Sequence, residues 1–444
     1  MRGLRSFLVL LVVGLGLGAY LYFVESKRDP SSGEKKDKVF TVESDKIDEL
    51  TVKAESGEQT SLKKSGTDWQ VVQPMTTASD SAAVTGITSN LSTLEISRVI
   101  DENPPDVAEY GLAQPRIEVT FKSGGQEHKL LIGRKTPPAT DLYAKLADQK
   151  RVFLVPSFVE STFNKTTFEL RDKTVLKLER DKIDTMSIST PTRTVAFHKN
   201  NGEWQMTAPV HARADFTTVD GLVSRLNSLQ MKAIVTDNAE KPADYGLDKP
   251  AVSVELGTGS SKAVLYIGSA AGEGAVHAKD QSRPMVFTVD ATLSTDLSKD
   301  PGEYRQRDLF DARAFNSTRI ELVRGDQTIA FEKSKTKNKE GQEEEKWRQV
   351  LPAAKDVDQS KVDNLVSAAT AVRGSGFVDS TAKTGIDKPI VTVTIKSDEG
   401  KREEKVAFAK NGADAYAVRT GEPGATKIDA GMIDNIVKSL DELK

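Results

Sequence analysis

The sequence contains no cysteine, and this absence excludes several kinds of chemistry. A chain without thiols forms no disulfide framework, no thiolate nucleophile, no cysteine-ligated zinc site and no iron–sulfur cluster. It also offers no cysteine for lipid attachment, so a lipoprotein is excluded. The redox compartment stays open, because a chain without thiols is indifferent to it.

Histidine and catalytic motifs are also scarce. The 4 histidines are His128, His198, His211 and His277, and none has metal-ligand neighbours at helical spacing. Metalloprotease, serine-hydrolase and calcium-loop patterns are absent. The run 133–136 resembles the end of a phosphate loop, but it lacks the required upstream glycine. We therefore expect no catalytic residue, no cofactor and no metal.

No excess of one charge stands out. Lys+Arg number 62 and Asp+Glu 65, which leaves a net charge of -3 and no field to recruit nucleic acid. Carboxylates are plentiful, so a carboxylate-based hydrolase remains an alternative. A deep acidic cleft with paired carboxyls about 5–10 Å apart would identify such an enzyme.

The N-terminus predicts the location. Arg2 and Arg5 precede an uncharged run from Phe7 to Val24, which would span about 27 Å as a helix. Residues 1–24 are therefore predicted to form a single-pass transmembrane anchor through residues 7–24, with a cytoplasmic N-terminus. The remainder would be periplasmic or extracytoplasmic.

A cleaved signal peptide is the alternative for this segment. Gly16-Leu17-Gly18 could serve as a small-residue cleavage site, but cleavage there would leave an apolar mature terminus. The retained anchor is therefore favoured. Residues 25–38 are polar, with proline, serine and glycine, and are expected to form a flexible linker.

The rest of the chain repeats itself. Several separated residues recur at one offset of 135 positions, which chance does not explain. The matched residues are Trp69 with Trp204, Tyr110 with Tyr245, Gly111 with Gly246, Pro115 with Pro250, and Gly133 with Gly268. These residues form a structural repeat signature rather than a reactive site.

A third copy is more diverged. It retains Trp347, Gly385 and Pro389, but Thr384 replaces the tyrosine and Ala409 lies near the place of the later glycine. Its tryptophan comes late because the charged run 332–346 is expected to lengthen a loop. The predicted units are repeat 1 at 39–170, repeat 2 at 171–307 and a diverged repeat 3 at 308–444.

Each unit is predicted to be α+β, with a mostly antiparallel sheet, one amphipathic helix and a short closing helix. In repeat 2 the helix signal is a set of apolar residues at helical spacing, with Asp215 or Thr217 as its cap. These apolar residues are Val219, Leu222, Val223, Leu226 and Leu229. The signature proline is expected to open an edge strand, and residues 434–443 to form the last closing helix.

The tryptophans allow two interpretations. Aromatic side chains line sugar and nucleobase sites, but equal spacing within a repeat favours a role in the core of each unit. The mixed-sign run 332–346 could likewise dock a partner, although such runs are usually solvated.

The tryptophan, the helix and the Tyr-Gly-Leu-x-x-Pro loop before a strand resemble the bacterial domain-of-unknown-function family 4340. The resemblance covers all three copies and implies an envelope-anchored accessory role, with ATP-driven exporters and gliding-motility-type machinery as neighbours. It transfers no catalytic residue. We therefore predict a non-enzymatic scaffold whose partners are envelope membrane proteins, of unknown oligomeric state. A binding module for cell-wall glycan or lipid is the alternative.

Overall fold

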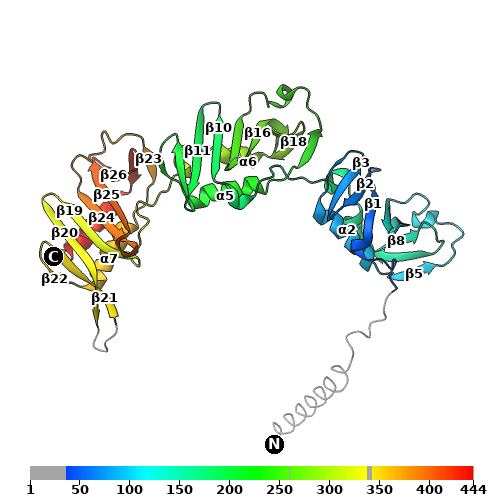
Figure 1. Cartoon of the computed structure of the whole chain (residues 1–444), viewed down its shortest axis with the longest axis horizontal. Helices are drawn as coiled ribbons and strands as arrows, with labels where there is room; N and C mark the ends of the chain where they lie inside the picture. The colour runs from blue at the N-terminus through cyan, green and yellow to red at the C-terminus, as the bar shows by residue number, and fades with distance from the viewer. Residues whose placement is uncertain (1–36, 260, 338–342, 444) are drawn as a thin grey trace, which may run out of the picture. The chain divides into compact units, whose positions relative to one another are not determined.

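The computed structural model describes residues 37–259, 261–337 and 343–443. The chain divides into two compact units, Met1–Lys173 and Thr174–Lys444. The first contains one nine-stranded antiparallel sheet and the second contains two more (Figure 1). The prediction of three similar, mostly antiparallel units is thus confirmed for the described residues, which carry seven α-helices.

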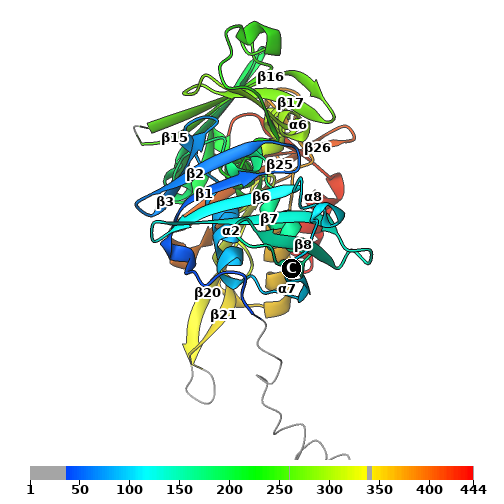
Figure 2. The same cartoon turned by 90° about the vertical axis from the view of Figure 1, so that its right-hand side faces the viewer.

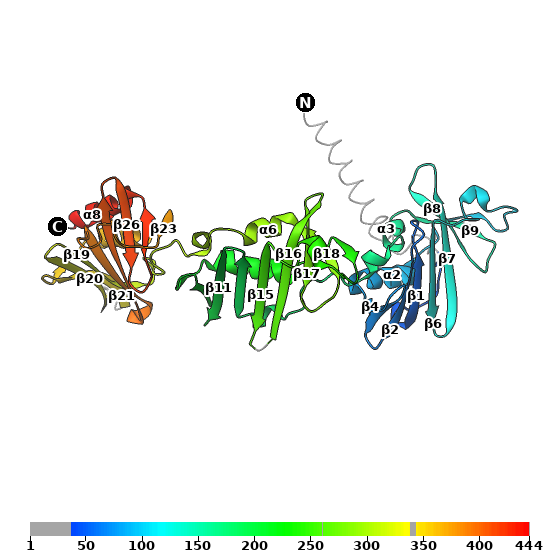
Figure 3. The same ribbon diagram turned by 90° about the horizontal axis from the view of Figure 1, so that it is seen from above.

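The first sheet has the order β4-β3-β2-β1-β6-β7-β8-β9-β5, and Figure 2 shows its central strands side by side. Its strands are β1 (Ile47–Lys53), β2 (Gln59–Ser65), β3 (Asp68–Gln73), β4 (Thr77–Ala78), β5 (Arg98–Asp101), β6 (Ile117–Ser123), β7 (Gln126–Lys135), β8 (Asp141–Leu146) and β9 (Val152–Pro156). Its helices are α2 (Ser81–Thr93), α3 (Val159–Phe163) and α4 (Thr167–Leu170). Figure 3 shows α2 and α3 on the same side of the sheet.

The second sheet repeats this order as β13-β12-β11-β10-β15-β16-β17-β18-β14. Its strands are β10 (Thr185–Thr190), β11 (Arg193–Asn200), β12 (Glu203–Ala208), β13 (Ala212–Arg213), β14 (Ala233–Thr236), β15 (Val252–Thr258), β16 (Ser261–Gly272), β17 (Ala275–Asp280) and β18 (Val286–Asp290). Its helices are α5 (Phe216–Asn227) and α6 (Ala291–Leu297).

The third sheet has the same topology, β22-β21-β20-β19-β24-β25-β26-β27-β23. Its strands are β19 (Ser317–Arg324), β20 (Gln327–Lys337), β21 (Glu343–Leu351), β22 (Lys355–Asp356), β23 (Gly376–Val378), β24 (Val391–Ser397), β25 (Arg402–Asn411), β26 (Asp414–Arg419) and β27 (Ala425–Ile428). Its helices are α7 (Gln359–Thr370) and α8 (Ala430–Asp441).

The repeats agree in register as well as in order. The first hairpin pairs Leu50 with Leu62, Met186 with Phe197, and Ile320 with Phe331, and a bulge interrupts the next ladder directly before the second residue of each pair. Because a one-residue slip would move every side chain to the opposite face, this agreement gives the three cores the same inward-facing positions.

Each long helix begins at an aspartate that caps it. The Asp215 carboxylate accepts a hydrogen bond from the Thr218 N–H at 2.8 Å, so Asp215 rather than Thr217 is the cap. The helix then buries Val219, Leu222, Val223 and Leu226 against the sheet. Leu229, expected on the same helix, lies beyond its end at Asn227. Asp80 and Asp358 cap α2 and α7 in the same way.

The charged run of repeat 3 corrects an expectation. It was predicted to lengthen a loop, but β20 continues to Lys337 and β21 starts at Glu343, so most of the run is paired strand. The ladder places Lys335 opposite Glu345, and opposite charges in such positions favour pairing. In Figure 1 this hairpin extends beyond the other strands of its sheet.

Two predicted boundaries also differ. The closing helix α8 starts at Ala430 rather than 434, because Asp429 caps it by accepting the Gly431 N–H at 2.7 Å. The strand after the signature proline was expected at a sheet edge, but β6, β15 and β24 each lie fifth among nine strands. The proline is tolerated because it comes two residues before the strand, where no ladder bond needs its amide.

The predicted membrane anchor at 1–24 lies outside the described residues, as does most of the linker at 25–38. Within the part of the chain that the structure describes, no helix has the length and apolar character needed to span a bilayer.

One glycine position tests a close approach that repeats 1 and 2 share. A Cβ added at Gly268 would lie 2.1 Å from the Tyr245 carbonyl oxygen, so Gly268→Ala should destabilise this unit by about 1–3 kcal/mol. Gly221, on α5 of the same unit, has open space around it, and Gly221→Ala should be neutral or stabilising by about 0.5–1 kcal/mol. Hydrogen exchange of residues 252–290 in the full chain measures both effects. Equal protection in the two variants would contradict the steric argument.

Candidate functional site

The signature glycines bring a loop onto a strand. Gly111 ends a 3₁₀ turn, Ala108–Tyr110, in the left-handed conformation with φ 71°, and its N–H donates to Ala108. A Cβ on Gly133 would lie 2.2 Å from the Tyr110 carbonyl oxygen. Only glycine fits both places, so this part of the signature serves packing between loop and strand.

Repeat 2 forms the same contact with Tyr245, Gly246 and Gly268, whereas repeat 3 does not. There Gly385 keeps the left-handed conformation at φ 74°, but its nearest neighbour is the Lys410 carbonyl oxygen. The buried Thr384 donates its hydroxyl to Thr381 at 2.6 Å, and Ala409 is fully buried. In repeat 3, where these two residues are substituted, the loop therefore follows a different local path.

The signature prolines take the same place in each unit. They lie two residues before the start of the fifth strand in sheet order and are not fully buried. They are Pro115, Pro250 and Pro389.

Two of the three tryptophans are buried and hydrogen-bonded. Trp204 is 2% exposed, and its indole N–H donates to Asp220 at 3.2 Å. Trp347 is also 2% exposed and donates to Asp363 at 2.8 Å. Trp69 is half-buried against the first core. In repeat 1, Thr85 stands at the position that Asp220 and Asp363 occupy in the other two repeats.

Cations complete the cluster around Trp204 and Asp220. Lys199 lies 5.4 Å from the Trp204 ring centroid and 3.3 Å from the Asp220 carboxylate, which Arg180 also contacts. Burial would raise the pKa of Asp220, but the hydrogen bonds from Trp204, Lys199 and Arg180 hold it below its ordinary value. The tryptophan face is thereby covered by the chain's own lysine rather than left open for a ligand.

The histidines do not converge. His128 stacks on Phe121 with 5.0 Å between ring centroids, and His277 contacts the Ser269 hydroxyl at 3.1 Å. His198 and His211 are exposed. Among the described residues, no group of three or more histidine and acidic side chains has the geometry to hold a metal ion. Residues 133–135 of the phosphate-loop-like run lie within β7.

A cluster of buried ionisable groups lies between the second and third sheets, within the unit 174–444. Arg213, on edge strand β13, donates to Glu422 and to Asp311, each at 2.6 Å, and to the Asp308 carbonyl at 2.7 Å. The side chains of Arg213 and Glu422 are only 13% and 11% exposed. One arginine of the second sheet thus binds three groups that follow it along the chain.

A second arginine belongs to the third sheet. Arg419 donates to Glu404 at 2.6 Å and to the Leu309 carbonyl at 3.1 Å. Glu404 also accepts the backbone N–H groups of Asp311 and Ala312 at 2.9 and 2.8 Å. This carboxylate is 5% exposed, and its hydrogen bonds fix the chain just before β19.

A third arginine comes from the segment between the two sheets. Arg305 lies 3.9 Å from the Phe377 ring centroid and 3.6 Å from Glu422. Its Nε is buried without a hydrogen-bond partner. Burial lowers the pKa of Arg305, although Glu422 opposes this effect.

These contacts surround a cavity of about 630 Å³ that Arg213, Glu404, Arg419 and Glu422 line. Burial would raise the pKa of Glu404, but its backbone hydrogen bonds and Arg419 lower it below the ordinary value. A general acid needs a carboxyl that keeps its proton near neutral pH, and Glu404 is held in the opposite state. The arrangement is suited to fixing two sheets together rather than to proton transfer.

The comparison with protein families matches the repeated part of the chain. The family model described as "Domain of unknown function (DUF4340)" matches residues 69–203 and 204–389, more than half of the chain. The chain belongs to this family. The resemblance predicted from the signature is thereby confirmed. Both matched segments begin at a signature tryptophan, so each runs from the middle of one sheet into the next.

The remaining comparisons add little. No curated protein matches the chain at a significant level. Among solved structures, a DNA polymerase sliding clamp from Pseudomonas aeruginosa is 10% identical, with 88% of this chain and 93% of that chain covered. Its TM-score is 0.14, which is too low to support any conclusion about fold or function.

The charged junction was not predicted. Most of its acidic and basic residues come from loops and strand ends outside the repeat signature. One signal was available: Glu169-Leu170-Arg171 recurs as Glu303-Tyr304-Arg305 at an offset of 134, close to the repeat period. That recurrence identifies the segment that places Arg305 in the charged junction.

Replacing the buried carboxylate tests the junction. Because the folded pKa of Glu404 lies below 4.5, its stabilising contribution is complete above that pH and is lost as the pH falls through the lowered value. Glu404→Gln should cost about 3 kcal/mol at neutral pH and weaken the acid dependence of unfolding. Urea unfolding of the full chain between pH 3 and 7 measures both.

Glu403→Gln is the matched control, since Glu403 is exposed and neighbours Glu404 on the same strand. It should leave the stability at neutral pH within about 0.5 kcal/mol of the parent chain. If both variants behaved alike, the ion pairs at the junction would not contribute to stability.

Proposed function

We propose that the chain is a non-enzymatic, membrane-anchored scaffold on the outer side of the cytoplasmic membrane. In this proposal residues 7–24 hold it in the bilayer with the N-terminus in the cytoplasm, and the repeats contact membrane proteins of an envelope complex. Components of an ATP-driven exporter or of a gliding-motility-like system are the first partners to test.

One observation carries this proposal: the residues that recur across the chain are used for packing. Gly111 and Gly133 allow a loop to meet a strand, and Trp204 closes a core with its indole N–H bound. A signature devoted to architecture supports a protein that acts through the surfaces its units present.

The state of the buried carboxylates supports the same proposal. Glu404 and Glu422 each pair with arginine, and the pKa of Glu404 lies below its ordinary value. A retaining or inverting hydrolase needs one carboxyl of its pair to be protonated. Ion pairs of this kind instead favour a fixed arrangement of neighbouring units.

The uncharged run at 7–24 supports the location, and the family resemblance supports an accessory role. The net charge of -3 offers no field for nucleic acid, which the proposal does not include as a partner. The oligomeric state is not part of the proposal.

Affinity purification from membranes of the native host tests the scaffold role. The full chain with a C-terminal tag should recover specific membrane proteins. Residues 1–38 fused to an unrelated exported domain form the control, because they keep the predicted anchor and linker. Recovery of no membrane protein above this control would contradict the proposal. Co-sedimentation with isolated cell-wall polymer instead would favour the glycan-binding alternative.

Protease protection tests the predicted orientation separately. Added to intact spheroplasts, protease should degrade the tagged repeats, while a cytoplasmic marker stays whole. Protection of the tag equal to that of the marker would place the repeats inside the cell and contradict the predicted topology.

A further inference from the structure

In repeat 1, the chain that leaves the closing helix returns to fill a groove beside β2. The Thr167 hydroxyl lies 2.7 Å from the Thr60 hydroxyl, and the Thr167 N–H donates to Glu58 at 3.0 Å. Leu170, at the end of α4, is fully buried in the first core. The groove is thus closed by a segment that follows the sheet in sequence.

Repeat 2 closes the same groove with the 3₁₀ turn Pro301–Tyr304. Tyr304 is fully buried, packs edge-on against Phe197 with 5.6 Å between centroids, and donates its hydroxyl to the Asp296 carbonyl at 2.8 Å. Arg193, at the start of β11, donates to the Lys299 carbonyl at 2.6 Å. A leucine in one repeat and a tyrosine in the next therefore fill equivalent places.

The returning segment also pairs with the edge strand of its own sheet. In repeat 1 the Asp80 N–H donates to the Leu170 carbonyl at 2.9 Å, and an antiparallel bridge joins Ser79 to Arg171. In repeat 2 the Asp215 N–H donates to the Tyr304 carbonyl at 2.8 Å, and the bridge joins Ala214 to Arg305.

A second backbone hydrogen bond completes this bridge in both repeats. The Asp172 N–H donates to Ala78 at 2.9 Å, and the Gln306 N–H donates to Arg213 at 3.0 Å. Both segments thus pair with the chain directly after β4 and β13 through one antiparallel bridge.

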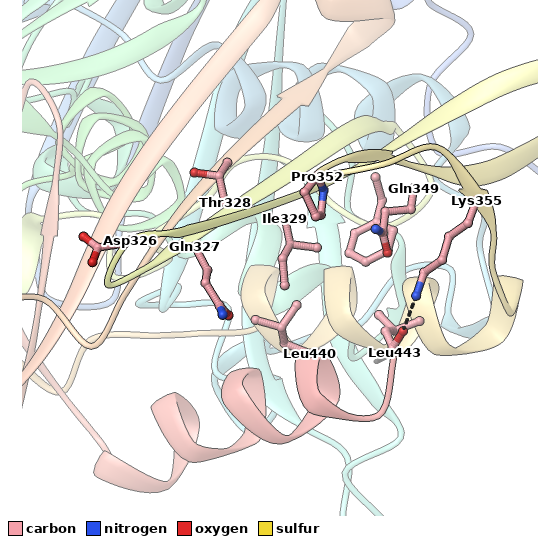
Figure 4. Close-up of a pocket in the computed structure, with 10 residues that line it drawn as sticks. Asp326, Gln327, Thr328, Ile329, Gln349, Pro352, Lys355, Leu440 and Leu443 are labelled. Atoms are coloured by element: carbon pink, nitrogen blue, oxygen red, sulfur yellow. Dashed lines mark hydrogen bonds between the residues drawn. The ribbon is translucent and has the colours of Figure 1, made fainter.

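In repeat 3 the equivalent groove is filled only in part: Leu440 and Leu443 pack in the same core cluster as the fully buried Phe331, and a cavity remains beside them. Phe331 pairs with Ile320 as Phe197 pairs with Met186, so Phe331 is the counterpart of the ring that Tyr304 covers. A cavity of about 550 Å³ lies there, and Figure 4 shows the side chains around it. We call it the third-repeat groove; it is lined by Ile329, Phe331, Gln349, Lys355, Leu440 and Leu443.

The edge strand beside this groove has the same potential for pairing. By the register of β21 with β22, Val357 is the counterpart of Ser79 and Ala214. Within residues 37–259, 261–337 and 343–443, no bridge to Val357 is found. Leu440, on the long helix α8, and Leu443, just beyond the end of that helix, form one wall, but neither reproduces the backbone bridge that the other repeats make.

The groove differs from its counterparts in polarity. Lys355 stands where repeats 1 and 2 have Thr77 and Ala212, and its exposed ammonium reaches the Leu443 carbonyl at 3.5 Å. Figure 4 shows this contact at the mouth of the cavity. Lys355 thus puts a positive charge beside the edge of β22, where an added strand would pair.

The charge opposite Lys355 can be derived from the register. If the ladder at Ala214 and Arg305 is continued by two residues, Arg307 comes opposite Ala212, and by the same step Lys173 comes opposite Thr77. In repeat 3 this position faces Lys355. A basic residue there would be repelled and an acidic one attracted, so the chain's own closing segments are poor occupants.

We propose that the third-repeat groove binds an extended peptide segment of a partner protein by adding it as an antiparallel strand at Val357. The segment places one tyrosine or leucine side chain in the cavity beside Ile329 and Leu443, and an acidic residue, three positions later, opposite Lys355. Main-chain pairing supplies affinity in such complexes, and the two side-chain positions supply specificity. This inference rests on the proposed scaffold role and names its docking surface.

Peptide binding to the full chain tests the groove. The probe is a fluorescently labelled peptide with the sequence of residues 299–308, measured by anisotropy beside the same peptide carrying Arg307→Glu. The Arg307→Glu peptide should bind about fivefold more tightly, because a like-charge pair becomes an opposite-charge pair. Peptides with Tyr304→Ala, or with an N-methyl group on the Gln306 amide, should lose binding.

Lys355→Glu in the full chain is the decisive variant. Lys355 is exposed, so folding is expected to be unaffected, and the variant should reverse the order of the two peptides. Ile329→Glu should abolish binding of both. No binding of either peptide at millimolar concentration, or a preference that Lys355→Glu leaves unchanged, would overturn the inference.

Self-association is a separate outcome. If the full chain dimerised and its own Tyr304→Ala variant did not, the occupant would be a second copy and the partner assignment would be wrong. Failure here can be told apart from failure of the scaffold role. Recovered membrane partners without peptide binding would refute only the groove, and charge-dependent peptide binding without partners would refute only the scaffold.

Discussion

The backbone pairing between each returning segment and the edge strand of its own sheet is the constraint on which the rest of the structure depends. At Ala214 and Arg305 this pairing closes the second core, because it carries Tyr304 onto Phe197. It also delivers Arg305 to Glu422 and Phe377 of the third sheet. One short ladder therefore completes a core and begins the contact with the next unit.

The charged junction depends on that delivery. Arg213 contributes its carbonyl to the ladder through the Gln306 N–H and its guanidinium to Glu422 and Asp311. Burying such groups costs desolvation energy, and an apolar interface would achieve comparable stability. What the ion pairs add is direction, because the planar guanidinium of Arg213 binds three groups at once and therefore accepts few orientations of its partners. The junction thus favours one arrangement of two sheets that share a topology and would otherwise have several ways to pack.

Much of this architecture was predictable from the sequence, and the limits have physical causes. The offset of 135 residues identified the repeats because glycine at 111 and 133, and tryptophan at 204, are demanded by local geometry. The position of the fifth strand was predicted wrongly, since a proline before a strand does not show whether neighbours flank it on both sides. The hairpin of repeat 3 was mistaken for a loop because its stability comes from cross-strand pairs such as Lys335 with Glu345, which periodicity does not reveal. The charged junction could not be predicted either, because it joins residues as far apart in sequence as Arg213 and Glu422.

Part of the divergence of repeat 3 lies where its surroundings differ. Inward positions keep their apolar character, as Phe331 and Ile320 show, while Lys355 departs from its counterparts Thr77 and Ala212 beside the third-repeat groove. Here Gln349 and Lys355 lie on neighbouring strands and face one cavity, next to an edge that repeats 1 and 2 cover with their own chain. A unit whose edge strand is not paired by its own chain must either blunt that edge with charge or offer it to another chain. A lysine beside this cavity serves the second purpose, because it repels the basic segments of this chain and leaves the cavity available to an acidic one.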